Sequence, residues 1–116
     1  MGLAYEEKND YPRARATYEK ALAISSSKDR FLNLIGLMHY YENRMPDAII
    51  HYRKAINING NEPVYWSNLG LAYRDAGNFV EAEKAMTKAV ELGGAETYQP
   101  RLDQIKKFAE ELNVQK

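Results

Sequence analysis

Residues 63–94 read PVYWSNLGLAYRDAGNFVEAEKAMTKAVELGG, and this stretch decides the fold. Its first half repeats an apolar stripe every three or four residues, the period of one helical face, at Trp66, Leu69, Gly70 and Tyr73. Pro63 stands where a helix can begin, because the first turn of a helix does not need its N–H. A turn signal, Gly77-Asn78, follows. The second half carries a stripe of the same period, closed by two glycines, at Phe79, Ala82, Met86, Ala89 and Val90. The stretch therefore predicts two helices joined by a tight turn.

The pattern recurs along the chain with a period of about 34 residues. The matching positions are small or apolar, and in chain order they include Gly2, Gly36 and Gly70; Leu3, Leu37 and Leu71; Ala14, Ala48 and Ala82; and Ala21, Ala55 and Ala89. A mid-helix glycine such as Gly70 costs about 1 kcal/mol of helix propensity relative to alanine, so we expect it where two helix backbones approach closely. The sequence predicts an all-α fold of antiparallel helix pairs.

The spacing W-x-x-L-G-x-x-Y at residues 66–73, with Ala82 and Ala89 behind it, resembles the tetratricopeptide repeat signature, a family whose repeat has the same period. The chain departs from that signature at three positions where the family has an aromatic residue, namely Leu32, His39 and Met86. The resemblance covers about residues 1–94 and implies a right-handed α-solenoid, in which each helix pair stacks on the next.

This register divides the chain into a truncated first repeat (1–28), two complete repeats (29–62 and 63–94) and a C-terminal segment (95–116). Met1 aligns with positions inside the first helix of the other repeats, so we expect the chain to be a fragment of a longer array. The C-terminal segment does not match the repeat, but it has one apolar face, formed by Leu102, Ile105, Phe108, Ala109 and Leu112. That face predicts a capping helix over the last repeat, followed by a short tail.

Composition excludes several classes of function. The chain has 16 Lys+Arg and 16 Asp+Glu, so its formal net charge is zero and gives no general attraction to nucleic acid. It has no Cys, which removes disulfides, thiolate metal sites and cysteine nucleophiles and leaves the cellular compartment open. No apolar run approaches the roughly 20 residues that span a bilayer. We therefore expect no nucleic-acid partner and no membrane insertion.

Catalytic and metal-binding patterns are weak. His39 lies at a core position, so we interpret it as a buried imidazole in place of a tyrosine, and we expect His51 to face solvent. Neither histidine has neighbours in sequence at metal-ligand spacing. The adjacent pairs Glu6-Glu7 and Glu110-Glu111 diverge by about 100° on a helix, too far apart to serve one substrate as acid and base. We expect no catalytic residue, no metal and no cofactor.

The resemblance implies a binding site instead, because the first helices of tetratricopeptide repeats line a concave groove. Transferred residue by residue, the groove positions of the two complete repeats are Arg30, Asn33, Leu34, Leu37, Tyr40, Tyr41, Val64, Ser67, Asn68, Leu71, Arg74 and Asp75. Those of the truncated repeat are Leu3, Glu6 and Glu7. Asn68 stands where family members hold the backbone of an extended peptide, a task that suits an amide because it both donates and accepts hydrogen bonds. The resemblance thus implies a protein or peptide partner. The alternative is that Leu34, Leu37 and Leu71 only pack between repeats and the groove stays empty.

Chaperone-binding members of the family hold a C-terminal carboxylate with a clamp of Lys, Asn, Asn, Lys and Arg. In the register above, the clamp positions within the chain hold Leu3, Leu34, Val64 and Asn68. One repeat further along, they hold Asn33, Leu37, Asn68, Tyr98 and Leu102. Neither set restores the clamp, so we predict no high-affinity capture of a C-terminal carboxylate.

Two further hypotheses remain open. The chain can be a targeting domain within a larger multidomain protein. It can also self-associate, because a truncated first helix uncovers part of an apolar stripe formed by Tyr11, Ala14, Tyr18, Ala21 and Leu22. Each large apolar side chain left in water forgoes roughly 1.5–3 kcal/mol, so this truncated N-terminal edge predicts a homo-oligomer.

Overall fold

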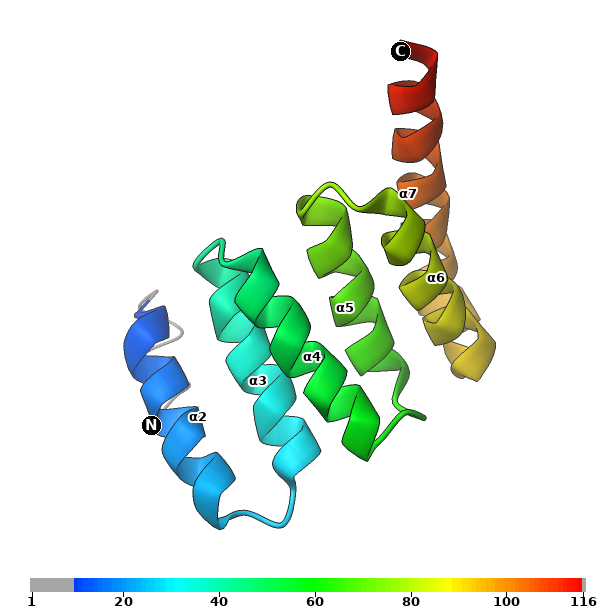
Figure 1. Ribbon diagram of the computed structural model, residues 1–116. Coiled ribbons are helices and arrows are strands. Elements are labelled where there is room, and N and C mark those ends of the chain that lie inside the picture. The colour runs from blue at the N-terminus through cyan, green and yellow to red at the C-terminus, as the bar shows by residue number, and fades with distance from the viewer. Residues whose placement is uncertain (1–9, 116) are drawn as a thin grey trace. The chain divides into compact units, whose positions relative to one another are not determined.

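The computed structural model describes residues 10–115, with side chains described to residue 112. The elements in this range are α2 (Tyr11–Ile24), α3 (Lys28–Tyr41), α4 (Met45–Ile58), α5 (Pro63–Asp75), α6 (Phe79–Ala89), the π-helical turn η1 (Val90–Gly94) and α7 (Ala95–Gln115). All of them are helical, as the sequence predicts. The beginning of the truncated repeat, with its groove positions Leu3, Glu6 and Glu7, lies outside the described residues. The chain forms two compact units, residues 1–60 and 61–116, each shown in Figure 1.

The turn within each complete repeat has the same backbone geometry. Two residues beyond the ends of α3 and α5 lie residues with positive φ, Asn43 (61°) and Gly77 (83°), which occupy equivalent positions in the two repeats. The N–H of Asn43 bonds Tyr40 O at 3.0 Å, and that of Gly77 bonds Arg74 O at 3.0 Å. The next residue closes the turn in both repeats, with N–O distances of 2.8 Å from Arg44 to His39 and 2.9 Å from Asn78 to Tyr73. Both turns are therefore Schellman motifs, which satisfy the last carbonyls of the helix and reverse the chain.

Helix starts follow from local chemistry. α5 begins at Pro63, as predicted, and α2 and α4 also carry a proline in the first turn, where no N–H is needed. Asp10 and Asn78 cap α2 and α6, because their side-chain oxygens accept hydrogen bonds from Arg13 N (3.4 Å) and Glu81 N (3.3 Å). These caps and prolines mark the starts of α2, α4, α5 and α6, whereas α3 starts after Ser27, whose side chain makes no capping hydrogen bond.

In the first unit, α3 packs against both α2 and α4. One side of α3 forms an apolar cluster with α2, which contains Ala14, Tyr18, Ile35 and Met38. On the other side, a Cβ added to Gly36 would lie 2.7 Å from the Tyr52 ring and 3.3 Å from Ala48 O. The helices approach at this glycine because a larger residue would hold them apart. In the stripe at the expected N-terminal edge, Ala14 and Tyr18 are buried, whereas Tyr11 and Leu22 are half-buried and pack on the same cluster.

In the second unit, α6 packs between α5 and α7. Its core is an apolar cluster formed by Ala82, Met86, Ala89, Tyr98, Leu102 and Ile105. A Cβ on Gly70 would lie 3.3 Å from Ala82 O, so the predicted close approach of the two helices is confirmed. Met86 and Trp66 contribute to the same cluster, Met86 at its centre and Trp66 at its edge.

The chain turns between α6 and α7 at Gly93, whose φ of 106° is left-handed. The sequence predicts a helix end at Gly93-Gly94, and the regular helix α6 ends earlier, at Ala89, with η1 completing the turn. α7 is the predicted capping helix, and its Leu102 and Ile105 are buried against α6. Its apolar face is covered only in part, because Phe108 is 51% exposed and Leu112 is 42% exposed.

Candidate functional site

The predicted groove residues of the second repeat all lie on α3, and they fall into two groups. Leu34 and Leu37 are half-buried and pack on the apolar cluster between α2 and α3, so they contribute to the core of the first unit. Arg30 and Tyr41 are exposed, while Asn33 and Tyr40 are half-buried. The surface that α3 can offer to a ligand is therefore cationic near its start and aromatic near its end.

Three tyrosines form the aromatic part of this surface. The Tyr41 ring lies 5.1 Å from that of Tyr11 on α2 and 6.0 Å from that of Tyr40, the latter in an edge-on arrangement. Ring contacts of this kind stabilise a fixed side-chain orientation by about 0.5–1.5 kcal/mol per pair. Tyr41 stays 47% exposed within these contacts. It offers a ligand apolar area together with a hydroxyl group, at little cost in side-chain entropy.

The predicted groove residues of the third repeat lie on α5. Val64 is exposed and Asn68 is half-buried. Leu71 packs on the apolar cluster between α6 and α7, so it contributes to the core of the second unit, as its counterpart Leu37 does for the first. Arg74 is ion-paired with Asp75, its neighbour in sequence, with 2.8 Å between Nε and Oδ1. The pair neutralises much of the charge that Arg74 brings to this surface.

Ser67 is not available to a ligand, so its assignment as a groove residue is wrong. It is buried, and its Oγ accepts a hydrogen bond of 2.8 Å from Nη1 of Arg101 on α7. The Arg101 guanidinium also lies 5.4 Å from the centre of the Tyr98 ring, within the range of a cation–π contact. Ser67 therefore ties α5 to α7. The repeat pattern carries no sign of this role, because Arg101 belongs to the segment that does not repeat.

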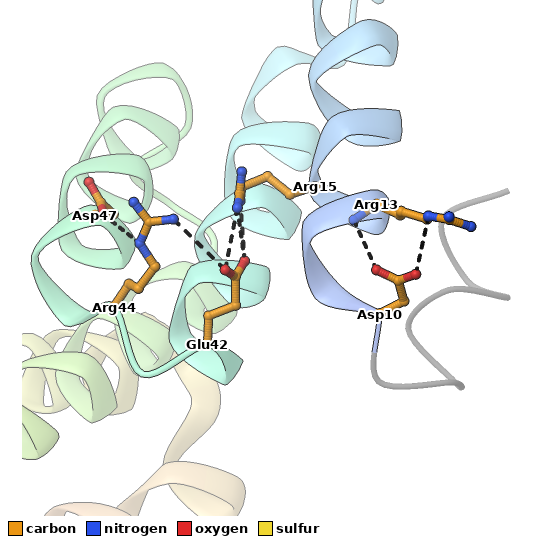
Figure 2. Close-up of polar contacts among 6 residues, drawn as sticks. All are labelled: Asp10, Arg13, Arg15, Glu42, Arg44 and Asp47. Atoms are coloured by element: carbon orange, nitrogen blue, oxygen red, sulfur yellow. Dashed lines mark hydrogen bonds and ion pairs between the residues drawn. The ribbon is translucent and has the colours of Figure 1, made fainter.

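A chain of ion pairs fixes the end of α3, next to Tyr40 and Tyr41. Arg15 of α2 holds Glu42 with two hydrogen bonds, Nε–Oε1 at 3.2 Å and Nη2–Oε2 at 3.3 Å (Figure 2). Arg44 then bridges Glu42 at 3.8 Å and Asp47 of α4 at 3.2 Å. The Arg15 and Glu42 side chains are only 19% and 16% exposed, so they are screened less than a surface pair. This network holds α2 and α4 to the C-terminal end of α3.

The two histidines lie side by side on α3 and α4. Their ring centres are 5.1 Å apart, and His51 Nδ1 donates a hydrogen bond of 2.8 Å to Asp47 O. The expectation that His51 faces solvent is therefore wrong: it is half-buried, because α3 and α4 run antiparallel from one tight turn. His39 is buried, as predicted, and its Nδ1 has no hydrogen-bond partner within residues 10–112.

This environment favours a neutral His39. Burial, reinforced by the positive charge of Arg15, lowers the pKa of His39 below its ordinary value. Smaller contributions come from His51 and Arg44, which lower the pKa, and from Asp47, which raises it. Over the described residues, no group of three or more histidines and carboxylates is placed to hold a metal ion. The histidine pair is thus a packing contact.

The positions of the carboxylate clamp can also be located. In the register shifted by one repeat, Tyr98 and Leu102 occupy two of its positions, and both are buried in the cluster between α6 and α7. In the first register, Val64 is exposed and Leu34 packs on the core. At these positions the structure offers a carboxylate no cationic group.

These repeats can be compared with known proteins. A tetratricopeptide repeat family model matches residues 1–65, and a second one matches residues 63–94. The chain belongs to the tetratricopeptide repeat family. Residues beyond 94 lie outside both matches, in the segment that does not repeat. No curated protein matches the chain.

Solved tetratricopeptide repeat domains share its fold. The Sgt2 domain from Aspergillus fumigatus is 24% identical with a TM-score of 0.89, and the match covers 97% of this chain and 77% of that one. The first domain of Spaghetti (RPAP3), bound to the HSP90 peptide SRMEEVD, is 17% identical with a TM-score of 0.86, over 94% and 87% of the two chains. The Yersinia enterocolitica secretion chaperone SycD, in complex with a peptide of the translocator YopD, is 16% identical with a TM-score of 0.80, over 98% and 88%. The chain is thus an all-α solenoid of antiparallel helix pairs that ends in a capping helix. Within residues 10–115, no helix is both long and apolar enough to span a membrane.

Proposed function

We propose that this chain is a non-catalytic interaction module that binds a peptide segment of a partner protein, and that its candidate surfaces are the outward face of α3 in the first unit and the outward face of α5 in the second. The observation that carries the proposal is the division of α3 into two faces. Its residues Ile35, Met38 and His39 are buried, while Arg30 and Tyr41 stay exposed at positions that the family uses for ligands. Support also comes from two proteins of the same fold, Spaghetti and SycD, whose structures contain bound peptides.

The chemistry of the two faces describes the ligand. Arg30 can form a charge-assisted hydrogen bond with an acidic or carbonyl group, and Tyr41 can cover an apolar side chain. Asn68 on α5 can bond both a backbone N–H and a backbone C=O, which suits an extended segment. Because Arg74 is already paired with Asp75, the faces together do not favour a highly acidic ligand. The proposed ligand is a peptide that mixes polar and apolar side chains.

A displayed library of random peptides tests this proposal with the intact chain. Peptides selected on the chain are titrated by calorimetry against the double variant Arg30→Glu with Arg74→Glu. The matched control carries the same charge change on α4, as Arg53→Glu with Lys54→Glu, since both residues are exposed there. We expect about a tenfold or greater loss of affinity for the first variant and little change for the control, because charged contacts at an interface contribute on this scale. Equal affinity for both variants would place the ligand elsewhere and refute the proposal.

The peptide SRMEEVD provides a second test, because it is bound by the structurally similar domain of Spaghetti. We predict that this chain does not capture it with micromolar affinity, since the Lys and Arg positions of the clamp hold Val64 and Asn68 in one register and Asn33, Tyr98 and Leu102 in the other. Fluorescence anisotropy with a labelled peptide measures this binding. Micromolar binding that disappears when the terminal carboxylate is amidated would contradict the prediction.

In the stripe that motivated self-association at the N-terminal edge, Ala14 and Tyr18 are buried and the other three residues are half-buried. That hypothesis and the role as a targeting domain of a larger protein remain predictions.

A further inference from the structure

Among residues 10–115, no helix packs beside the C-terminal part of α7. α7 contains 21 residues and its neighbour α6 only 11, so α7 extends past the start of α6, as its red end in Figure 1 shows. Phe108 and Leu112 lie on this part and are 51% and 42% exposed. On α6, Val80 is 66% exposed. This surface of the second unit therefore presents three large apolar side chains.

A cleft of about 780 Å³ lies between the start of α6 and this part of α7. Its apolar lining includes Phe79, Val80, Ala109 and Leu112, and the polar residues Asn78, Glu83, Lys84 and Thr87 complete it. On the other side of Phe108, a smaller hollow of about 350 Å³ is lined by Gln104, Lys107 and Glu111. Phe108 therefore stands as a ridge between a cleft of mixed lining and a charged hollow, a shape that a second amphipathic helix can fill.

The charges around this ridge identify the occupant. Residues 106–111 read KKFAEE, with two lysines before the apolar pair and two glutamates after it. At roughly 100° per residue, Lys107 and Glu111 both lie on the flank of Phe108 that faces the charged hollow. If two such helices run antiparallel about a two-fold axis near Ala109, Lys107 of each lies level with Glu111 of the other. In a parallel pair, lysine would face lysine and glutamate would face glutamate.

We propose that the cleft binds the same segment of a second copy of this chain, with the two α7 helices antiparallel. Phe108 and Leu112 of each copy then enter the cleft of the other copy, and two pairs of opposite charges border the contact. The arrangement is isologous, because one patch meets itself. The patch is small, so the dimer dissociates readily, as interfaces well below about 1,200 Å² of buried surface do.

Sedimentation velocity of the intact chain over a range of concentrations tests the dimer. The variant Phe108→Glu with Leu112→Glu removes the apolar contact and should raise the dissociation constant by about tenfold or more, because buried apolar anchors dominate small interfaces. The matched control is Ile24→Glu with Ile58→Glu, which changes two exposed apolar residues outside α7 and should leave the dimer intact. A wild-type chain that stays monomeric at every concentration assigns the cleft to another occupant and overturns the proposal.

Charge reversal tests the pairing itself. One variant carries Lys106→Glu with Lys107→Glu, and the other carries Glu110→Lys with Glu111→Lys, so each has one sign of charge along the contact. Both keep the apolar residues, and circular dichroism verifies that both stay folded. Each alone should be monomeric, and an equimolar mixture should form a heterodimer. Two variants that still form homodimers as strong as the wild type would overturn the assigned contact.

Disulfide trapping tests the antiparallel direction, since the chain has no cysteine of its own. Under mild oxidation, a mixture of Lys107→Cys and Glu111→Cys chains should form a mixed crosslink faster than either chain crosslinks with itself. Preferred self-crosslinking of the Lys107→Cys chain would show a parallel pair and overturn the proposed geometry. None of these changes touches α3 or α5, so peptide binding by the proposed groove should persist in every variant.

Discussion

Replacement of Gly36 by alanine has two opposing effects on the stability of the fold, and their sizes can be compared. Alanine is the better helix former by about 1 kcal/mol, so the change alone would stabilise α3. The new Cβ, however, would lie 2.7 and 2.8 Å from two carbons of the Tyr52 ring and 3.3 Å from Ala48 O. Tyr52 is almost completely buried, so its ring has no free space to enter.

The size of the stability loss depends on how far α3 and the Tyr52 ring must move apart. To restore a contact of 3.4 Å, α3 and the Tyr52 ring must separate by roughly 0.7 Å, the difference between 3.4 and 2.7 Å. Overpacking of a filled core by one methyl group costs about 1–3 kcal/mol, which exceeds the gain in helix propensity. Because a contact of 2.7 Å requires a large shift, we expect a cost in the upper part of that range, about 2–3 kcal/mol, so that Gly36→Ala lowers the free energy of unfolding by about 1–2 kcal/mol once the propensity gain is subtracted.

Gly70→Ala is the matched control, because Gly70 occupies the equivalent position in the next repeat. There the nearest atom is the flexible end of the Met86 side chain, at 3.1 Å, which can rotate away. We expect the cost and the propensity gain to cancel to within about 0.5 kcal/mol.

Urea unfolding followed by far-UV circular dichroism measures both variants. With a slope of about 2 kcal/mol per molar, a loss of 1 kcal/mol lowers the midpoint by about 0.5 M. A Gly36→Ala chain as stable as the wild type, or a Gly70→Ala chain that loses more, would refute the reasoning. Adding Tyr52→Leu makes the test sharper. If the tyrosine ring causes the destabilisation by Gly36→Ala, that destabilisation should be smaller in the Tyr52→Leu background.

Three more predictions rest on contacts described above. Arg15→Ala and Glu42→Ala should each cost about 1–3 kcal/mol, since each leaves a partly buried charge without its partner. Their double-mutant cycle should show coupling, and additive losses would contradict a direct pair. Because the pKa of His39 is lower in the folded chain than in the unfolded one, stability should fall as the pH drops through about 6.5, where the unfolded histidine gains its proton. Urea midpoints at several pH values should show a weaker dependence of stability on pH in His39→Tyr than in the wild type. An unchanged dependence would point to another titratable group. Gly93→Ala should cost about 1 kcal/mol through its positive φ alone, with the non-strained Gly60→Ala as control, and equal stabilities would refute a strained turn.

The sequence could predict the fold because the repeat pattern lies in the core. Gly70 and Ala82 recur with the period of the repeat, and the structure places them where two helix backbones meet. The turn signal Gly77-Asn78 likewise marks a Schellman turn. Core and turn positions tolerate few residue types, so the constraint appears in every repeat as the same small or apolar residue.

Contacts between helices were harder to predict. His51 was expected in solvent, yet it packs on His39 from the neighbouring helix. Its face is set by the rotation and stagger of α4 on α3, and one turn of error moves a side chain by about 5.4 Å. A usable signal existed, because both histidines lie within two turns of one tight turn between antiparallel helices. No such signal existed for Ser67, whose partner Arg101 lies outside the repeats.

The candidate site shows the same division between constrained and free positions. Leu37 and Leu71 are equivalent by the repeat period, and each is half-buried on the core of its own unit. Their positions could be predicted from the repeat, but whether a ligand also touches them could not, because packing already accounts for both leucines. The exposed residues carry the more specific information.

Those exposed residues differ between the two complete repeats at equivalent positions. Arg30 corresponds to Val64, and Tyr41 corresponds to Asp75, at the same places on α3 and α5. Because packing does not constrain these positions, their differences are free to follow a ligand. A peptide on α3 would then meet a cation and an aromatic ring, whereas a peptide on α5 would meet an apolar side chain and a paired carboxylate. Peptides selected from a library should therefore fall into two groups, one weakened by Arg30→Ala with Tyr41→Ala and the other by Val64→Ala, and peptides indifferent to all three changes would argue that a ligand does not read these positions.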